Sequence, residues 1–307
     1  MNMRRVFLFL GLNFAVVITV SILAQIFHIS PYLHKYGINY QELALFCFIW
    51  GMCGAGISLL LSKKIAQWSL KIRSISKNST NPQEIFLYTT VKHLAIQASL
   101  PMPEVGIFSS KEPNAFATGP TKRHALIAVS SGLMEKLSPD EIEAVIGHEI
   151  THIANGDMVT MALLLGVSNV FVLFFSKIFA YLFSSFLLKG KNSHSSSQSP
   201  FLYYIFTIIF EIIFMFVGSI ILAYFSRLRE YKADRGSASL LGKGPMISAL
   251  KRLEDIYCLE KNKGKKLLSQ ESSLSALFIF GGKSWTQLFS THPSIEKRIA
   301  MLNQLQK

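Results

Sequence analysis

The pentapeptide His148-Glu149-Ile150-Thr151-His152 contains residue types that can bind a metal ion and use it in hydrolysis. On an α-helix, residues four apart project from one face, so both imidazoles can reach a single tetrahedral ion. Glu149 lies at the edge of that face, where its carboxylate can take a proton from a water molecule at the ion. The spacing predicts a hydrolase with one zinc ion per subunit. The alternative is a chance match on a structural helix.

The residues around the pentapeptide favour a well-defined helix. Ser138 can cap its start, Pro139 suits the first helical position, and Glu141 completes a capping box. We expect this helix to end near Asn155-Gly156. A capped amphipathic helix argues against the chance match.

A third ligand is expected further along the chain. The extended HExxHxxGxxH pattern fails, because Asn155 and Met158 stand where glycine and histidine are required. Glu230 and Asp234 share a helical face, so one carboxylate can bind the ion while the other accepts a hydrogen bond from a ligand histidine. Basic neighbours leave a solvated acid pair as the alternative interpretation of Glu230 and Asp234.

The composition indicates a membrane protein. Hydrophobic residues make up 50% of the chain and charged residues 16%, and the mean hydropathy is +0.36. The net charge is +13, but no aromatic-interleaved basic patch, zinc knuckle or helix-turn-helix signature accompanies it, so we expect no nucleic-acid partner. Three cysteines without a CxxC pair predict neither a disulfide framework nor a cysteine metal site.

Four apolar segments predict four transmembrane helices in two hairpins, at residues 6–27, 41–61, 158–188 and 201–225. The first resembles a signal peptide but is long enough to span a bilayer and lacks a convincing cleavage site. Five basic residues follow the second segment, whereas the short 28–40 connection carries one lysine. The positive-inside rule therefore places the N-terminus and the chain after residue 62 on the cytoplasmic side of the lipid bilayer.

The regions between these segments have a mixed composition of polar and apolar residues, as in a soluble domain. Residues 84–100 predict a helix, and residues 105–108, 115–118 and 125–129 predict short strands. A polar stretch at 259–273 predicts a flexible segment. We therefore divide the chain into a transmembrane hairpin (1–62), a first part of a cytosolic domain with the HExxH sequence (63–157), a second hairpin (158–225) and a second part of the domain with the third ligand (226–307).

The chain resembles the HtpX family of bacterial membrane metallopeptidases, which are related to CAAX prenyl proteases and Oma-type peptidases. The resemblance covers nearly the whole chain and rests on these sequences: Pro101-Met102-Pro103-Glu104-Val105, Asn114-Ala115-Phe116-Ala117-Thr118-Gly119, His148-Glu149-x-x-His152, Glu230-x-x-x-Asp234 and Thr291-His292-Pro293. It implies that His148, His152 and Glu230 bind zinc and that Glu149 is the general base. Asp234 is then not a ligand itself but accepts a hydrogen bond from a ligand histidine.

Two further segments have interpretations as parts of an active site. Asn114, Ala115, Phe116, Ala117 and Thr118 could form an edge strand that pairs with an extended substrate, or an ordinary structural strand. His292 could donate a hydrogen bond to the oxyanion of the reaction, or serve a structural role.

Lys177 and Glu211 are ionisable residues inside the third and fourth apolar segments. Both lie roughly 15 Å from the hairpin tip at 1.5 Å per residue, so antiparallel helices would place them at similar depth. Unpaired charge is costly there. We hypothesise that they face each other; the alternative is that Lys177 snorkels and Glu211 is neutral or faces water.

These observations predict a mainly α integral membrane protein with a cytosolic α+β, gluzincin-like zinc peptidase domain that contains a small β-sheet. It would be an endopeptidase of the bacterial cytoplasmic (inner) membrane that cleaves membrane or misfolded proteins. The resemblance implies a role in membrane-protein quality control under stress, alongside other quality-control proteases, and self-cleavage after extraction. Two alternatives stay open: a site-2-type intramembrane protease and a non-enzymatic scaffold with structural zinc. Charged residues around the pentapeptide disfavour the first, and Glu149 disfavours the second.

Overall fold

The computed structural model describes residues 40–188, 200–267 and 292–305. The chain divides into two compact units. One consists of the described parts of residues 1–58 and 161–222, and the other of those of 59–160 and 223–307. The first predicted apolar segment, at 6–27, and most of the Ser-rich connection after residue 188 lie outside the described residues.

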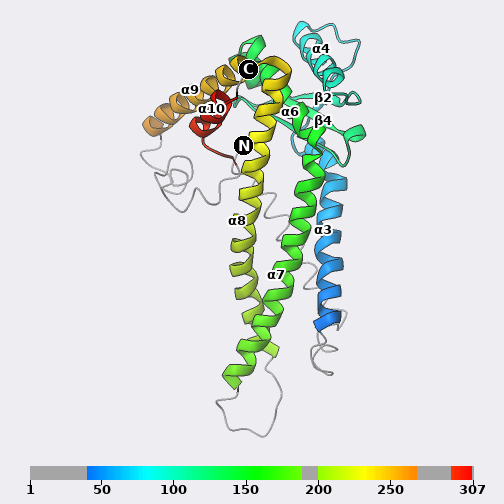
Figure 1. Cartoon of the computed structure of the whole chain (residues 1–307), viewed down its shortest axis with the longest axis vertical. Helices are drawn as coiled ribbons and strands as arrows, with labels where there is room; N and C mark the ends of the chain where they lie inside the picture. Colours follow the sequence, from blue (N-terminus) through cyan, green and yellow to red (C-terminus); the bar gives the residue numbers. More distant parts are fainter. Residues whose placement is uncertain (1–39, 189–199, 268–291, 306–307) are drawn as a thin grey trace. The chain divides into compact units, whose positions relative to one another are not determined.

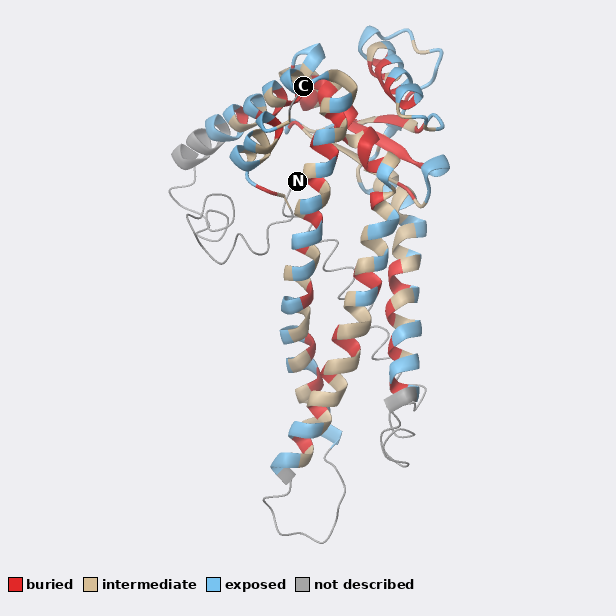
Figure 2. Cartoon of the chain, in the orientation of Figure 1, coloured by how far each residue is buried: buried red, intermediate tan, exposed pale blue. Residues whose placement is uncertain are grey.

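Three described helices are long and apolar enough to cross a membrane: α3 (Tyr40–Ser69), α7 (Asp157–Leu188) and α8 (Pro200–Leu241). They contain the predicted segments 41–61, 158–188 and 201–225, which are confirmed as apolar helices. Many residues along these helices are exposed (Figure 2), and large hydrophobic side chains are among them, as on a surface in contact with lipid. The described residues thus support three of the four predicted spans.

Aromatic contacts define how α7 and α8 pack in the first unit. Ring centroids of Phe183 and Phe206 lie 6.0 Å apart, and those of Phe179 and Phe210 lie 5.5 Å apart. From the first pair to the second, the residue number falls by four on α7 and rises by four on α8, so the two helices are antiparallel. Lys177, half-buried, is therefore level with the turn of α8 that holds the buried Glu211. The expected similar depth agrees with this register, and the ion pair itself stays a prediction.

A four-stranded sheet forms the centre of the second unit. Its strands are β1 (Arg73–Ser74), β2 (Glu104–Phe108), β3 (Ala115–Thr118) and β4 (Leu126–Ser130), in the order β1-β2-β4-β3. β2 and β4 are parallel, and the two outer pairings are antiparallel. β4 is buried along its length, whereas β3 is partly exposed at one edge. The three predicted strands correspond to β2, β3 and β4; the two-residue β1 was missed.

Helices pack against this sheet and against one another around a shared hydrophobic core (Figure 1). They are α4 (Pro82–Gln97), the 3₁₀ turn η1 (Lys122–His124), α5 (Ser131–Lys136), α6 (Pro139–Asn155), α9 (Lys243–Leu267) and α10 (Ile295–Asn303). The predicted helix at 84–100 corresponds to α4. The expectation of a flexible segment at 259–273 is wrong for its first part, because α9 continues to Leu267.

The helix that carries the HExxH sequence begins and ends as the sequence predicts. The Ser138 hydroxyl accepts a hydrogen bond from the backbone N–H of Glu141, and the Glu141 side chain accepts one from the backbone of Ser138. Gly156 closes the helix with φ of 68°, a left-handed conformation that favours glycine. The predicted boundaries of α6 are confirmed.

The last part of α8 packs closely against α6. A side chain on Gly236 would overlap Thr151, and the Ser237 hydroxyl donates a 2.7 Å hydrogen bond to the backbone carbonyl of Ala144. Small residues at this contact let the two backbones approach each other. Since α8 continues without interruption past its apolar part, it carries Glu230 and Asp234 to the HExxH face of α6.

We expect Gly236→Ala to lower the free energy of unfolding by about 1–3 kcal/mol, because the added methyl group overpacks the contact with Thr151. Gly244→Ala is the control: Gly244 is exposed in the first turn of α9 with no atom near its would-be Cβ, so the added methyl group overlaps nothing. Thermal unfolding of both variants in detergent, with zinc content measured in parallel, checks this. Equal midpoints would contradict the proposed packing.

Candidate metal centre

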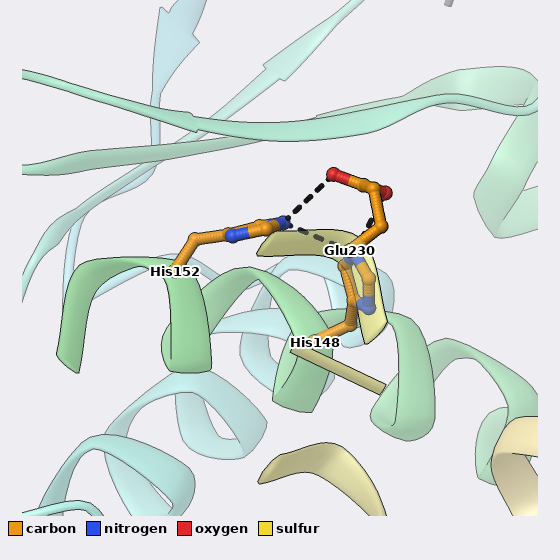
Figure 3. A group of neighbouring side chains, drawn as sticks. All are labelled: His148, His152 and Glu230. Carbon is orange, nitrogen blue, oxygen red and sulfur yellow. Dashed lines mark hydrogen bonds and ion pairs between the residues drawn. The ribbon is translucent and has the colours of Figure 1, made fainter. Parts of the chain in front are cut away.

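His148, His152 and Glu230 point toward one another from two helices (Figure 3). The Nε2 atoms of the two histidines lie 3.1 Å apart. Glu230 Oε2 is 3.5 Å from His148 Nε2, and Glu230 Oε1 is 3.4 Å from His152 Nε2. All three residues are buried. The structure therefore brings together the three side chains that the sequence nominated as ligands.

These separations suit a single small ion. A tetrahedral zinc site with ligand bonds of about 2.0–2.1 Å has neighbouring ligand atoms about 3.3 Å apart. The observed separations of 3.1, 3.5 and 3.4 Å fall around that value. Three protein ligands would leave a fourth position open for water or substrate, as catalytic zinc sites do.

Each histidine is oriented by a carboxylate on its other ring nitrogen. His152 Nδ1 lies 2.6 Å from Asp157 Oδ2, and His148 Nδ1 lies 2.9 Å from Asp234 Oδ1. A proton on each Nδ1 donates to these acids, which leaves the Nε2 lone pairs facing inward. Arg298 in turn donates to both oxygens of Asp234, from Nε at 2.8 Å and from Nη2 at 2.5 Å.

The inward face of the site therefore consists of acceptors. When both imidazoles are neutral, two lone pairs and a carboxylate converge there, an arrangement that a proton or a metal cation would stabilise. Burial lowers the pKa of His148, but the hydrogen-bonded carboxylates of Asp234 and Glu230 outweigh this and raise the pKa to about 9. The pKa of His152 is lowered by burial and raised on balance by Asp157 and Glu230. The site thus has a high affinity for positive charge.

Glu149 is next to the edge strand rather than among the ligands. Its Oε2 accepts a 2.8 Å hydrogen bond from the backbone N–H of Ala117 on β3. This contact brings the predicted general base and the predicted substrate strand together, and it involves a strand residue at the exposed edge of the sheet. The base and a peptide bound along β3 would therefore lie beside each other.

His292 contacts the third ligand. Its Nδ1 lies 2.8 Å from Glu230 Oε2, and its side chain is 36% exposed. The sequence nominated His292 for the oxyanion of the reaction; the structure places it beside the candidate metal site, with one ring nitrogen directed to Glu230. A contact with substrate in this ring orientation would use the second ring nitrogen.

Sequence reasoning missed two supporting residues. Asp157 lies just beyond the end of the HExxH helix, where an acid can fold back onto His152. Arg298 carries no local signal, because it approaches Asp234 from α10, 64 residues further along.

The fold and the site define a membrane-bound metalloprotease, with an HExxH helix, a third acid on a following helix and apolar helices long enough to span a bilayer. Residues 83–306 match the family described as Peptidase family M48, and the chain belongs to this family.

Similar proteins extend over the whole chain. It is 47% identical over 305 residues to a protein named Protease HtpX homolog from Paracidovorax citrulli, covering 99% of this chain and 100% of the relative. It is 43% identical to Protease HtpX from Chromohalobacter salexigens, covering 98% of both chains. The crystal structure of S. mikatae Ste24p shares the fold, with a TM-score of 0.56 and 17% identity over 92% of this chain and 63% of that one. These findings confirm the resemblance to HtpX proteins.

We expect zinc to bind more tightly as the pH rises. Binding requires neutral His148, whose ordinary pKa of 6.5 is raised to about 9, so the ion must displace a proton below pH 9. One displaced proton corresponds to about a tenfold gain in affinity per pH unit between these values. Because the folded protein holds the His148 proton more tightly than the unfolded chain, metal-free protein should lose stability as the pH rises from 6.5 to 9. Competition with a chromophoric chelator at several pH values measures the slope.

Asp234→Asn is the control for this dependence. It removes the carboxylate on His148 Nδ1, so its pH slope should be shallower than that of the native protein. A native affinity that does not change with pH would contradict the expectation.

Proposed function

We propose that the chain is a zinc-dependent endopeptidase whose ion is held by His148, His152 and Glu230. The observation that carries the proposal is the convergence of three buried acceptors, with Glu149 beside an exposed strand edge. Two imidazoles, one carboxylate and an open position are typical of catalytic zinc. Asp234 orients His148 from outside.

Zinc at this site would lower the pKa of water and polarise the peptide carbonyl. Glu149 accepts the proton of the attacking water and delivers it to the leaving amine. β3, with Asn114 before it and Ala115, Phe116, Ala117 and Thr118 within it, holds the substrate backbone in extended form. His292 donates a hydrogen bond to the oxyanion that forms on the substrate.

The proposed substrates are membrane proteins and misfolded proteins. Recognition through backbone hydrogen bonds supports a wide range of sequences, as a quality-control protease under stress requires. We place the chain in a bacterial cytoplasmic membrane with the active site facing the cytoplasm, on the basis of the basic residues that follow residue 62. Glu230 comes five residues, or about 8 Å of helix, after the apolar segment 201–225, which supports a site near the membrane surface.

Two observations weigh against the alternatives. A site-2-type protease embeds its HExxH helix in an apolar span, whereas α6 starts with Asp140 and Glu141 in its first turn. A scaffold with structural zinc has no use for a base, whereas Glu149 is positioned at the strand edge by a hydrogen bond. Both support an enzyme with its site outside the apolar spans.

Glu149→Gln is expected to reduce casein cleavage by about 10²–10⁴-fold, because general acid–base catalysis contributes on that order. Its zinc content should equal that of the native protein, since Glu149 is not a proposed ligand. Purification of both proteins in detergent, followed by metal analysis and a cleavage assay with and without chelator, checks this.

Glu230→Gln provides the comparison, with loss of both zinc and cleavage expected from a ligand. If the native, zinc-loaded protein left casein intact, the scaffold interpretation would replace the enzyme.

His292→Ala should lower kcat by about 10²–10³-fold with little change in KM, as removal of an oxyanion donor does. The contact with Glu230 makes zinc affinity the second measurement. An unchanged zinc affinity with the lower kcat supports contact with the oxyanion; a parallel loss of zinc would assign His292 to ligand support instead.

A further inference from the structure

The alternation of hydrogen-bonded and non-bonded residue pairs between β3 and β4 shows which backbone groups of β3 face outward. Asn114 and Ser130 form a hydrogen-bonded pair, because the Ser130 N–H donates to the Asn114 carbonyl at 2.8 Å. In an antiparallel ladder, hydrogen-bonded and non-bonded pairs alternate. Since Ala115 is opposite Val129 and Ala117 opposite Ile127, both alanines are in non-bonded pairs. Their N–H and C=O groups therefore face away from β4, toward the free edge of the sheet.

One of these outward groups already has a partner. The Ala117 N–H donates to Glu149 Oε2 at 2.8 Å. A peptide that adds to the edge of β3 requires the same donor, because a strand pair uses both the N–H and the C=O of each outward-facing residue. One N–H cannot serve a substrate carbonyl and a carboxylate at full strength.

We propose that the substrate backbone displaces Glu149 from the Ala117 N–H. This proposal rests on the proposed function. In the resting enzyme the Ala117 N–H holds the carboxylate of Glu149, and a substrate carbonyl takes over this hydrogen bond when an extended segment pairs with β3. Glu149 is then released toward the water that it deprotonates. The availability of the base is thereby coupled to an occupied strand edge.

The position of the contact favours this exchange. Ala117 is the β3 residue that reaches Glu149, so a peptide bond within range of Glu149 must lie alongside Ala117. Glu149 also adjoins His148 in sequence, so the same segment of substrate lies near the proposed ligands. A peptide too short or too folded to pair with Ala117 would leave the base engaged. This selects extended segments by their backbone rather than by their side chains.

The test is the affinity of a fluorescently labelled, extended casein peptide for two zinc-loaded variants in which cleavage is strongly reduced. The amide introduced by Glu149→Gln retains an oxygen that can accept from the Ala117 N–H, whereas Glu149→Ala leaves that N–H to the peptide. We expect Glu149→Ala to bind the peptide about three- to tenfold more tightly, the range that a net neutral hydrogen bond gives. Fluorescence anisotropy measures both affinities. Equal affinities would overturn the proposal.

Two proline variants identify why Glu149→Ala should bind the peptide more tightly than Glu149→Gln. Ala117→Pro removes the contested N–H without removing a ladder hydrogen bond, because that group faces outward. The difference between Glu149→Ala and Glu149→Gln should vanish when Ala117→Pro is added. Ala115→Pro is the matched control, which weakens peptide binding but preserves the difference. If Glu149→Ala still bound the peptide more tightly than Glu149→Gln in the presence of Ala117→Pro, the tighter binding would come from the space left by the smaller side chain. That result would refute an exchange of the hydrogen bond.

Hydrogen exchange of the 114–119 segment gives a readout that does not depend on the proline variants. Without peptide, this segment should exchange faster in Glu149→Ala than in Glu149→Gln, and peptide should slow it in both. Equal exchange in the two variants would contradict the proposal. Failure of the native protein to cleave casein is a separate outcome, which would reject the proposed function itself.

Discussion

The convergence of three acceptors on one small volume is the constraint on which the second unit of the structure depends. When their imidazoles are neutral, His148 and His152 face Glu230 as acceptors, and buried acceptors repel one another unless a proton or a metal ion lies among them. The protein sustains this arrangement from outside. Asp157 and Asp234 fix the histidine rings, so that the lone pairs remain directed inward. The site is thus arranged for positive charge by the fold itself.

Arg298 shows how the negative charge of this arrangement is limited. Three buried acids, Asp157, Glu230 and Asp234, lie in or next to the site, and burial disfavours such a concentration of charge. The guanidinium binds both oxygens of Asp234, and its side chain is 12% exposed, so it offsets one carboxylate at short range. Since α10 supplies this residue, the C-terminal helix contributes to the metal centre although it carries none of the proposed ligands.

Much of the site could be predicted from the sequence because its signals are local. A capping box and a closing glycine define α6 within a short stretch of chain, and the i, i+4 spacing then fixes which side chains share a face. The pair Glu230 and Asp234 follows the same rule on α8. Which acid binds the ion could not be worked out from spacing, and only the resemblance to a family assigned Glu230.

What the sequence could not predict depends on contacts between distant segments. Arg298 carries no local signal, and the hydrogen bond from Ala117 to Glu149 requires both the strand parity and the placement of β3 beside α6. The length of α8 was also underestimated, since the apolar pattern ends at residue 225 while the helix continues to Leu241. Loss of hydrophobicity marks the end of a membrane span and not the end of a helix. The polar extension buries its small residues, Ala233 and Ser237, within the second unit, and this is why it remains helical.

The continuity of α8 has a consequence for how catalysis and membrane anchoring are combined in one chain. At 42 residues the helix is about 63 Å long, roughly twice the hydrocarbon thickness of a bilayer, so one continuous helix supplies both an apolar span and a proposed ligand of the site. A ligand on a flexible loop after the span would have to be ordered separately, at an entropic cost for each residue. Placing Glu230 on the helix itself avoids that cost. It also means that the close contact between Gly236 and Thr151 fixes the position of Glu230, the proposed third ligand, relative to His148 and His152.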